Sequence, residues 1–222
     1  MSDKTEEDTP TVRWRRKSTS NAAMREMSMQ RITEAAFRLF VVRGYEATTL
    51  QQIADEVNMT KGAIFFYFQS KENLLLHLLA SAEEAVVSTF IEKVDSSNAS
   101  PSERIVDFFH HGARQGLEAP YRLLCLIQIS IVFSGQDNEI GRRVTDIYRR
   151  IYEHLTGIVE EGQKVGAFNN DIKPSEFVSM IVAMHDGMML EWQRRGGEID
   201  GRLLVQAVRV SMLNGMLAQG SR

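Results

Sequence analysis

A short segment between residues 49 and 71 holds the side chains of this chain that are best suited to chemistry. Two threonines stand where helices would begin, so their hydroxyls can cap a helix and the free amides beside them can bind a phosphate. A lysine adds a cation, a glycine allows close approach of the backbone, and an alanine can touch a thymine methyl group. A tyrosine and a second lysine are further phosphate ligands. The candidate DNA-binding residues are therefore Thr49, Thr60, Lys61, Gly62, Ala63, Tyr67 and Lys71; for Thr49, capping alone is the alternative.

An amphipathic helix is expected immediately before this segment. Apolar residues recur at helical spacing over 32–40, and Gly44 follows where a left-handed residue commonly ends a helix. Thr49 then forms a capping box with Gln52, the third residue after it. This capping box predicts a short helix over residues 50–57.

The break that follows is three residues long. Asn58 ends the first short helix, and Thr60 caps a second one that we expect over residues 61–66. Two short helices joined by such a break form a helix-turn-helix, whose second helix enters the major groove of DNA. Phe66 and Phe68 are expected to pack in the core rather than to contact DNA.

The whole segment resembles the N-terminal domain of TetR-type (tetracycline-repressor-like) transcriptional regulators, over residues 31–75 of the 222. It departs from the family pattern where Asn58-Met59 replaces Gly and an aliphatic residue, and where Phe65 replaces a Tyr. Asn also tolerates positive φ, so the turn is expected to be intact. The matching residues are Ala35, Ala36, Leu39, Phe40, Gly44, Tyr45, Thr48, Thr49, Leu50, Ile53, Ala54, Thr60, Lys61, Gly62, Ile64, Phe68, Ser70, Lys71 and Glu72.

The rest of the sequence argues against several classes of protein. Four prolines in 222 residues and helical patterns throughout predict an all-α fold of about nine helices. Cys125 is the only cysteine, which excludes an internal disulfide and a cysteine-based zinc site and favours a reducing cytoplasm. No phosphate loop, nucleotide-binding glycine motif or nucleophile elbow occurs, so we expect no enzyme activity, cofactor or metal. No apolar run is long enough to predict a membrane span, and the charged N-terminus is no secretory signal.

Charge is distributed unevenly along the chain. Residues 11–71 hold ten Lys and Arg against five Asp and Glu, a net charge of +5, whereas residues 1–10 sum to −3 and residues 72–222 to −5. A basic N-terminal module on an acidic body is typical of a DNA-binding protein with a second domain of other function. A solvated charged surface is the alternative interpretation of the charge alone.

Three parts are therefore expected. Residues 1–23 form a flexible basic arm, residues 24–70 the helix-turn-helix DNA-binding domain, and residues 71–222 a ligand-binding and dimerisation domain. The basic cluster over 13–17 could reach a minor groove or phosphates, or the arm could be a disordered tail without a role. A long helix that begins at Lys71 is expected to connect the two domains.

The last two helices, expected over 173–195 and 200–218, are apolar nearly all round. A helix without a polar face is buried on both sides, and a second copy of the chain is the simplest cover for the second side. The resemblance implies the same homodimer through the last two helices. Two recognition helices would then read an inverted repeat with half-sites about 34–36 Å apart.

The resemblance also implies a small-molecule effector, held in a cavity among the middle helices. Met-rich and aromatic surfaces accept hydrophobic or amphipathic molecules, although each such residue is alternatively ordinary core. Polar residues that could orient a ligand are His110, Arg114, Gln128, His185 and Asp186, of which His185 could instead lie in the dimer interface. The candidate ligand-binding residues are Phe108, Phe109, Ile127, Ile131, Tyr148, Tyr152, Met184, Met188 and Trp192.

Together these features predict a ligand-responsive transcriptional regulator, most simply a repressor, that binds a double-stranded DNA operator. A ligand that prefers the state unable to bind DNA weakens operator affinity, and DNA weakens ligand affinity by the same factor. The helix that begins at Lys71 is the expected lever between the two sites. The alternatives are an activator of the same fold, a ligand-independent DNA organiser, and an interaction protein with a relic DNA module.

Overall fold

The computed structural model describes residues 13–196 and 198–216, and each element within these ranges is a helix. The π-helical turn η1 continues α4 into α5, so these three form one helix and the described part of the chain contains nine. The predicted all-α fold is confirmed. The elements are α1 (Arg13–Arg43), α2 (Leu50–Glu56), α3 (Lys61–Phe68), α4 (Lys71–Glu83), η1 (Glu84–Ser88), α5 (Thr89–Asp95), α6 (Pro101–Glu118), α7 (Pro120–Val132), α8 (Glu139–Lys164), α9 (Pro174–Arg194) and α10 (Gly201–Met216).

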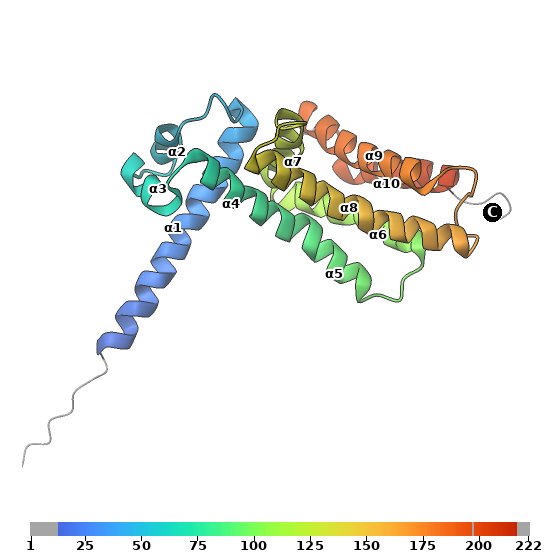
Figure 1. Cartoon of the computed structure of the whole chain (residues 1–222), viewed down its shortest axis with the longest axis horizontal. Helices are drawn as coiled ribbons and strands as arrows, with labels where there is room; N and C mark the ends of the chain where they lie inside the picture. Colours follow the sequence, from blue (N-terminus) through green and yellow to red (C-terminus); the bar gives the residue numbers. More distant parts are fainter. Residues whose placement is uncertain (1–12, 197, 217–222) are drawn as a thin grey trace, which may run out of the picture.

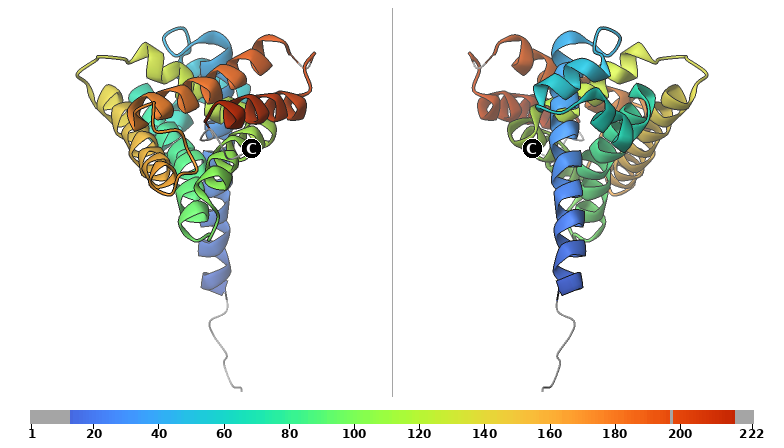
Figure 2. Two further views of the ribbon diagram at one scale, coloured as in Figure 1. Left: turned by 90° about the vertical axis from the view of Figure 1, so that its right-hand side faces the viewer. Right: turned by 90° about the vertical axis from the view of Figure 1, so that its left-hand side faces the viewer.

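Two groups of helices are joined by one long helix (Figure 1). α1, α2 and α3 lie at one end, and the N-terminal half of α1 projects away from the rest of the molecule. α6 to α10 form a bundle at the other end, and the helix made of α4, η1 and α5 runs from the first group along this bundle. The two end views show α1 standing across the end of the bundle (Figure 2). One continuous core of buried apolar side chains, from Ile32 to Val205, connects both groups.

Local hydrogen bonds set the ends of the short helices. The predicted capping box of Thr49 is complete, and Thr60 Oγ1 accepts a hydrogen bond from the α3 backbone at 3.2 Å. The predicted left-handed residues are present too, with φ of 88° at Gly44 and 55° at Asn58. Because the caps satisfy amides that have no partner inside their helix, they fix where α2 and α3 begin.

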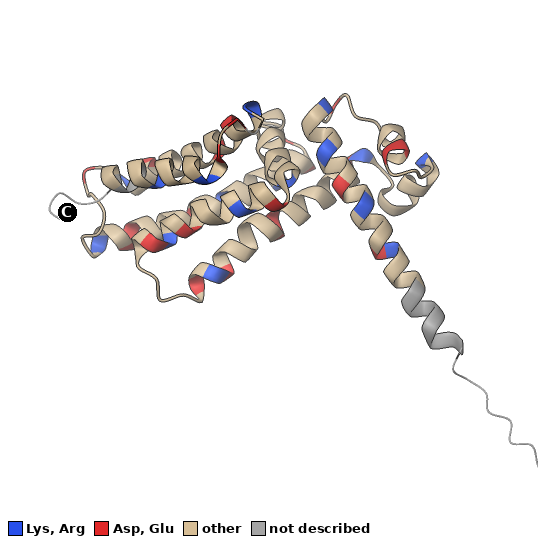
Figure 3. Ribbon diagram, turned by 180° about the vertical axis from the view of Figure 1, so that it is seen from behind, with Lys and Arg blue, Asp and Glu red and all other residues tan. Residues whose placement is uncertain are grey.

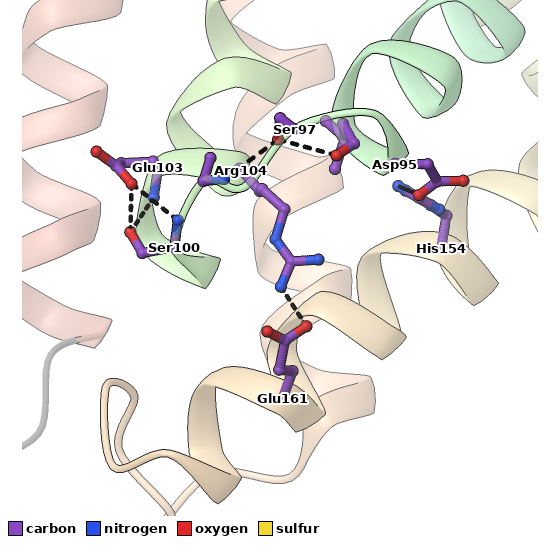
Figure 4. A network of polar contacts seen from close by, with 9 residues as sticks. Asp95, Ser97, Ser100, Glu103, Arg104, His154 and Glu161 are labelled. Atoms are coloured by element: carbon purple, nitrogen blue, oxygen red, sulfur yellow. Dashed lines mark hydrogen bonds and ion pairs between the residues drawn. The ribbon is translucent and has the colours of Figure 1, made fainter.

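Polar contacts hold the end of the bundle that lies far from α2 and α3 (Figure 4). Ser100 caps α6 with a complete capping box, and Arg104 on α6 pairs with Glu161 on α8. His154 Nε2 on α8 lies 3.9 Å from Asp95 Oδ1 at the end of α5. Burial lowers the pKa of His154, and Asp95 opposes this shift. The pair of Arg104 and Glu161 therefore ties α6 to α8, and His154 lies against the end of α5.

The N-terminal segment is more helical than the sequence predicts. An irregular arm is expected up to residue 23, whereas α1 begins at Arg13 and continues without a break to Arg43. No Gly or Pro occurs between Pro10 and Gly44, so nothing in this stretch ends the helix. Residues 1–12, the first part of the predicted arm, lie outside the described residues.

The connecting helix contains one distortion that the sequence does not predict. Over Glu84–Ser88 it makes a π-helical turn, and Thr89 Oγ1 donates to the Glu84 carbonyl at 2.9 Å. His111 Nε2 on α6 lies 3.0 Å from the Ala85 carbonyl, which gives this carbonyl a side-chain partner. By length and composition the helix could cross a membrane, but half of its apolar window is buried inside the fold, as suits a core helix.

Candidate nucleic-acid interface and effector cavities

Helices α2 and α3 are held so that the first turn of α3 is free. Ile53 of α2 and Ile64 of α3 are fully buried in the common core. The Arg31 guanidinium on α1 donates to the Val57 carbonyl at 2.7 Å, which satisfies a carbonyl at the end of α2. Residues 60–62 are exposed, so the beginning of α3 can approach another molecule.

Cationic side chains accompany this surface. Lys61 is exposed and forms no ion pair with a carboxylate of the described residues. Arg38 on α1 pairs with Glu56 on α2, so its charge is already matched. Lys and Arg lie along α1 and around the helix-turn-helix (Figure 3). Lys61 is therefore the cation best placed to meet a phosphate or a base edge.

The two candidate threonines differ in how their hydroxyls are used. Thr49 Oγ1 accepts from the Gln52 amide at 3.2 Å and donates to Gln52 Oε1 at 3.3 Å. Thr60 Oγ1 only accepts a hydrogen bond, so its proton can go to an added acceptor such as a phosphate oxygen. The structure thus favours capping for Thr49. Ala63 and Tyr67 are half-buried on the same helix as the exposed residues 60–62.

Lys71, a predicted phosphate ligand, is engaged inside the protein. Its ammonium donates to the Tyr45 carbonyl at 3.0 Å and lies 4.2 Å from the centre of the Tyr45 ring. The Glu46 carbonyl lies 3.5 Å away on the same side. Lys71 therefore ties the start of α4 to the loop after α1, and we separate it from the residues that are free to contact DNA.

Two aromatic residues of α3 are exposed, and the sequence predicts one of them in the core. Phe66 is 72% exposed and Phe65 is also exposed, whereas Phe68 is buried as predicted. The prediction for Phe66 is wrong because Ile64 and Phe68, four residues apart, already fill the one face that α3 turns to the core. The free surface of α3 thus combines a hydroxyl, a cation and two apolar rings.

Tyr45 forms a joint between the helix-turn-helix and the bundle. Its ring packs edge-to-face on Phe40 of α1 and on Phe133 at the end of α7, with centroids 5.1 and 5.5 Å away. Lys71 at the start of α4 contacts the same residue. Burial, with smaller contributions from nearby carboxylates, raises the pKa of Tyr45 to about 12, so its hydroxyl stays neutral.

Helix α7 carries a second set of contacts between the two groups of helices. Arg122 on α7 pairs with Glu34 on α1, at 3.5 Å between Nη2 and Oε1. The Gln128 amide donates to the Val41 carbonyl at 3.4 Å, so Gln128 serves this joint and not a ligand. The sequence predicts only the helix that begins at Lys71 as a lever. The structure adds α7 to the contacts between the helix-turn-helix and the bundle.

The predicted chamber among the middle helices is nearly filled by side chains. Its volume is about 20 Å³, enough for about one water molecule. Among the predicted ligand-binding residues, Phe108 and Tyr148 line this cavity. Phe109 and Ile127 are fully buried core residues that do not reach it.

Three further predicted ligand-binding residues lie outside this cavity. Ile131 is 67% exposed, so the prediction that it lines a chamber is wrong. Helix α7 is apolar nearly all round, and periodicity cannot tell which side of such a helix faces inward. Tyr152 is 40% exposed, and Met184 is half-buried; neither lines the cavity.

Polar contacts close the small cavity on one side. His185 Nδ1 lies 3.0 Å from Asp186 Oδ1, and the Tyr148 hydroxyl donates to Asp186 Oδ2 at 3.3 Å. Burial raises the pKa of Tyr148, so it remains a neutral donor. His185 is buried against Gly112, where an added Cβ would lie 2.0 Å from His185 Nε2. His185 therefore belongs to the core and not to an outer dimer face.

A larger pocket of about 450 Å³ opens between α6, α9 and α10. All three helices, α6, α9 and α10, contribute residues to its lining. Four residues that the sequence nominates for a ligand site meet here, namely His110, Arg114, Met188 and Trp192. Of the nine predicted ligand-binding residues, two line the small cavity and two line this pocket, and of these two places only the pocket has room for a small molecule.

The outer face of α9 and α10 is apolar and exposed. Met180 and Ala183 on α9 are exposed, as are Leu203, Ala207 and Val210 on α10. No described residue of the chain covers them. Helices that are apolar on both sides, as the sequence predicts, thus bury one side in the bundle and leave the other free.

Two features of the described ranges bear on metal and nucleophile chemistry, namely the possible metal ligands and Cys125. The described ranges contain no group of three or more His, Cys, Asp or Glu side chains placed to hold a metal ion. Cys125 is buried, and this burial raises the pKa of its thiol to about 12. A thiol that stays protonated is a poor nucleophile.

Comparison with known proteins relates this architecture to a large group of regulators. The family model described as bacterial regulatory proteins, tetR family, matches residues 32–78. The crystal structure of the MbdR regulator from Azoarcus sp. CIB superposes with a TM-score of 0.79 and is 37% identical, covering 86% of this chain and 100% of that one.

More distant relatives share the fold. The transcriptional repressor KstR2 of Mycobacterium tuberculosis is 23% identical over 197 residues, which are 85% of this chain and 92% of its own. The KstR2 structure superposes with a TM-score of 0.76. AibR, solved in complex with isovaleryl coenzyme A and operator DNA, is 20% identical and superposes with a TM-score of 0.71 over 82% of this chain and 96% of that one.

Proposed function

This chain belongs to the TetR family of bacterial regulatory proteins, and we propose that it is a repressor that binds an inverted-repeat operator as a homodimer and leaves it when a small effector binds. One observation carries the proposal: the first turn of α3 presents Thr60, Lys61 and Gly62 as exposed residues, with the Thr60 hydroxyl capping the helix. A helix N-terminus with a cation suits phosphates and base edges of the major groove. Because chromosomal operators are reached in the bacterial cytoplasm, we place the protein there.

The proposed dimer forms through the outer face of α9 and α10. Leu203, Ala207 and Val210 would pack against the same residues of a second copy, as a two-fold axis requires. One short helix contacts too few bases for specific binding, whereas two in register read both halves of an inverted repeat. Dimerisation is thus part of the DNA-binding function and not an addition to it.

The effector is proposed to be a hydrophobic or amphipathic small molecule. AibR, a protein of the same fold, was solved with an acyl thioester and with operator DNA, which is the pairing of ligands that we propose here. The closed central cavity favours the alternative of a ligand-independent DNA-binding protein. The pocket of about 450 Å³ beside it favours an effector, since it falls within the size range of ligand sites.

Release from the operator follows from the joint at Tyr45. A shift of α4 or α7 would move the contacts of Lys71 and Phe133 with Tyr45, and with them the angle at which α1 holds the helix-turn-helix. In a dimer, such a shift changes the distance between the two recognition helices. An effector that binds the shifted state more tightly therefore lowers operator affinity, at most by the ratio of its affinities for the two states.

The proposal is tested by selecting bound sequences from random double-stranded DNA with the purified full chain. We expect the selected sequences to share an inverted repeat. Analytical ultracentrifugation of the protein with the selected DNA should give two protomers per site. Leu203→Glu, which places charge on the proposed dimer face, should leave the fold intact and abolish specific binding. Selection of a single unpaired half-site, or unchanged binding by Leu203→Glu, would contradict the dimeric operator reader.

A further inference from the structure

We propose that the pocket between α6, α9 and α10 is the effector site and that it takes an amphipathic organic anion with several negative charges. An acyl thioester of coenzyme A has this chemistry, since an apolar chain is joined to a phosphate-bearing carrier. This inference rests on the proposed function, because it names the ligand class and the residues of a site that the function requires.

The floor of the pocket is apolar. Met188, Met189 and Val205 line it and are each almost completely buried. Gly116 on α6 lets Met189 lie directly against that helix, because a Cβ there would be 2.4 Å from the Met189 methyl carbon. Trp192 forms a wall beside Gly201. An apolar chain would find here a surface of thioethers and one indole, which adapts to varied shapes.

The rim of the pocket is cationic. Arg114 of α6 and Arg202 and Arg209 of α10 all line it, and no Asp or Glu does. None of the three arginines forms an ion pair with a carboxylate of the described residues. Other arginines of the body, such as Arg104 and Arg143, are paired. Three unmatched guanidinium groups around one opening favour a ligand with several anionic oxygens, since guanidinium binds phosphate in two-pronged fashion.

The proposed dimer uses other residues of α10 than this pocket does. On α10 the pocket takes Arg202, Val205 and Arg209, whereas Leu203 and Val210 are on the exposed apolar face. At 3.6 residues per turn these two sets are centred about 120° apart around the helix, so they are neighbouring faces that share no residue. A second copy on the outer face would therefore pack on residues other than these three pocket residues.

The pocket is also connected to the joint with DNA. α6, which forms one wall, packs along α7, and α7 carries the pairing of Arg122 with Glu34 and the packing of Phe133 on Tyr45. A ligand that separates α6 from α10 would displace α7 through this packing. The small central cavity has no room for such a ligand, since its volume is only about 20 Å³.

Binding can be followed through Trp192, since the chain has only one other tryptophan, Trp14. In the full chain with Trp14→Phe, acetyl-, octanoyl- and palmitoyl-coenzyme A are titrated against indole fluorescence, beside free octanoate and free coenzyme A. We expect saturable binding of at least one thioester. Octanoate and coenzyme A should each bind at least about tenfold more weakly than the best thioester, because each supplies only one half of the contacts.

Charge variants locate the site. Arg114→Gln and Arg209→Gln should each weaken thioester binding about tenfold, as expected for loss of a charge-assisted hydrogen bond. Arg149→Gln removes the same charge from an exposed arginine of α8 outside the pocket and should leave binding unchanged. Absence of binding by all three thioesters would overturn the proposal. So would equal effects of the three variants, which would indicate a general charge effect.

The two proposals fail separately. Protection of an operator by a protein that binds none of the thioesters would overturn the ligand class and leave the repressor standing. Thioester binding with the expected arginine dependence, in a protein that selects no operator, would support the site and contradict the proposed function.

Discussion

Glu83 offers the sharpest test of how the connecting helix is attached to the bundle. Its side chain is only 8% exposed, and its two oxygens accept from Arg143 and Arg150 on α8. Two charge-assisted hydrogen bonds would contribute about 3–6 kcal/mol if fully desolvated. The arginine side chains are 37% and 42% exposed, so water can solvate them when the bonds are lost, and this offsets much of the lost free energy. We therefore expect Glu83→Gln to lower the free energy of unfolding by about 2 kcal/mol.

Urea unfolding at one fixed protein concentration measures this change, because the stability of a dimer depends on concentration. With a slope of about 3 kcal/mol per M, the midpoint should fall by about 0.7 M. Glu153→Gln is the matched control, because it removes the same charge from an exposed ion pair of α8. The Glu153 side chain is 70% exposed, and its Oε1 lies 3.9 Å from Arg149 Nε. It should change stability by less than about 0.5 kcal/mol. Equal midpoints for both variants would refute the idea that buried pairing holds α4 to α8.

The core and the recognition helix yield three more expectations. Gly112→Ala should destabilise the fold by about 2 kcal/mol, because the added methyl collides with His185; calorimetric melting measures this, and an unchanged midpoint would contradict the packing. Cys125, with its pKa raised to about 12, should resist a thiol reagent at pH 8 until the chain is unfolded, so rapid labelling of the folded protein would show that it is accessible. Phe68→Ala should lower the free energy of unfolding by about 3 kcal/mol or more, because Phe68 is buried. Phe66→Ala should leave the free energy of unfolding unchanged and weaken operator binding, because Phe66 is exposed. Melting and gel-shift assays measure both effects, and the same behaviour of the two variants would contradict these placements.

Local features of this fold could be predicted from the sequence. The capping box at Thr49, the cap at Thr60 and the left-handed residues Gly44 and Asn58 depend on neighbours a few positions away, and each is present. The same holds for the two short helices of the helix-turn-helix and for the apolar character of the last two helices on all sides. Side chains and backbone within one turn determine these features, so pattern alone is enough.

Features that depend on which helices meet could not be predicted. Lys71 has the type and position of a phosphate ligand, but the Tyr45 carbonyl lies 3.0 Å from its ammonium. Ile131 belongs to a helix that is apolar on every side, and only its packing shows that it faces outward. The ligand residues were predicted as one set, whereas the fold closes one cavity and opens another beside Trp192. Long-range packing decided all three.

The central claim is that the exposed start of α3 reads an operator. Footprinting of the DNA upstream of this gene, across a salt series, tests it most directly with the full chain and with Lys61→Ala. We predict a protected inverted repeat whose affinity falls steeply with salt, and loss of protection in Lys61→Ala with a shallower salt dependence. Protection that Lys61→Ala leaves intact, or uniform coating without a repeat, would contradict the account.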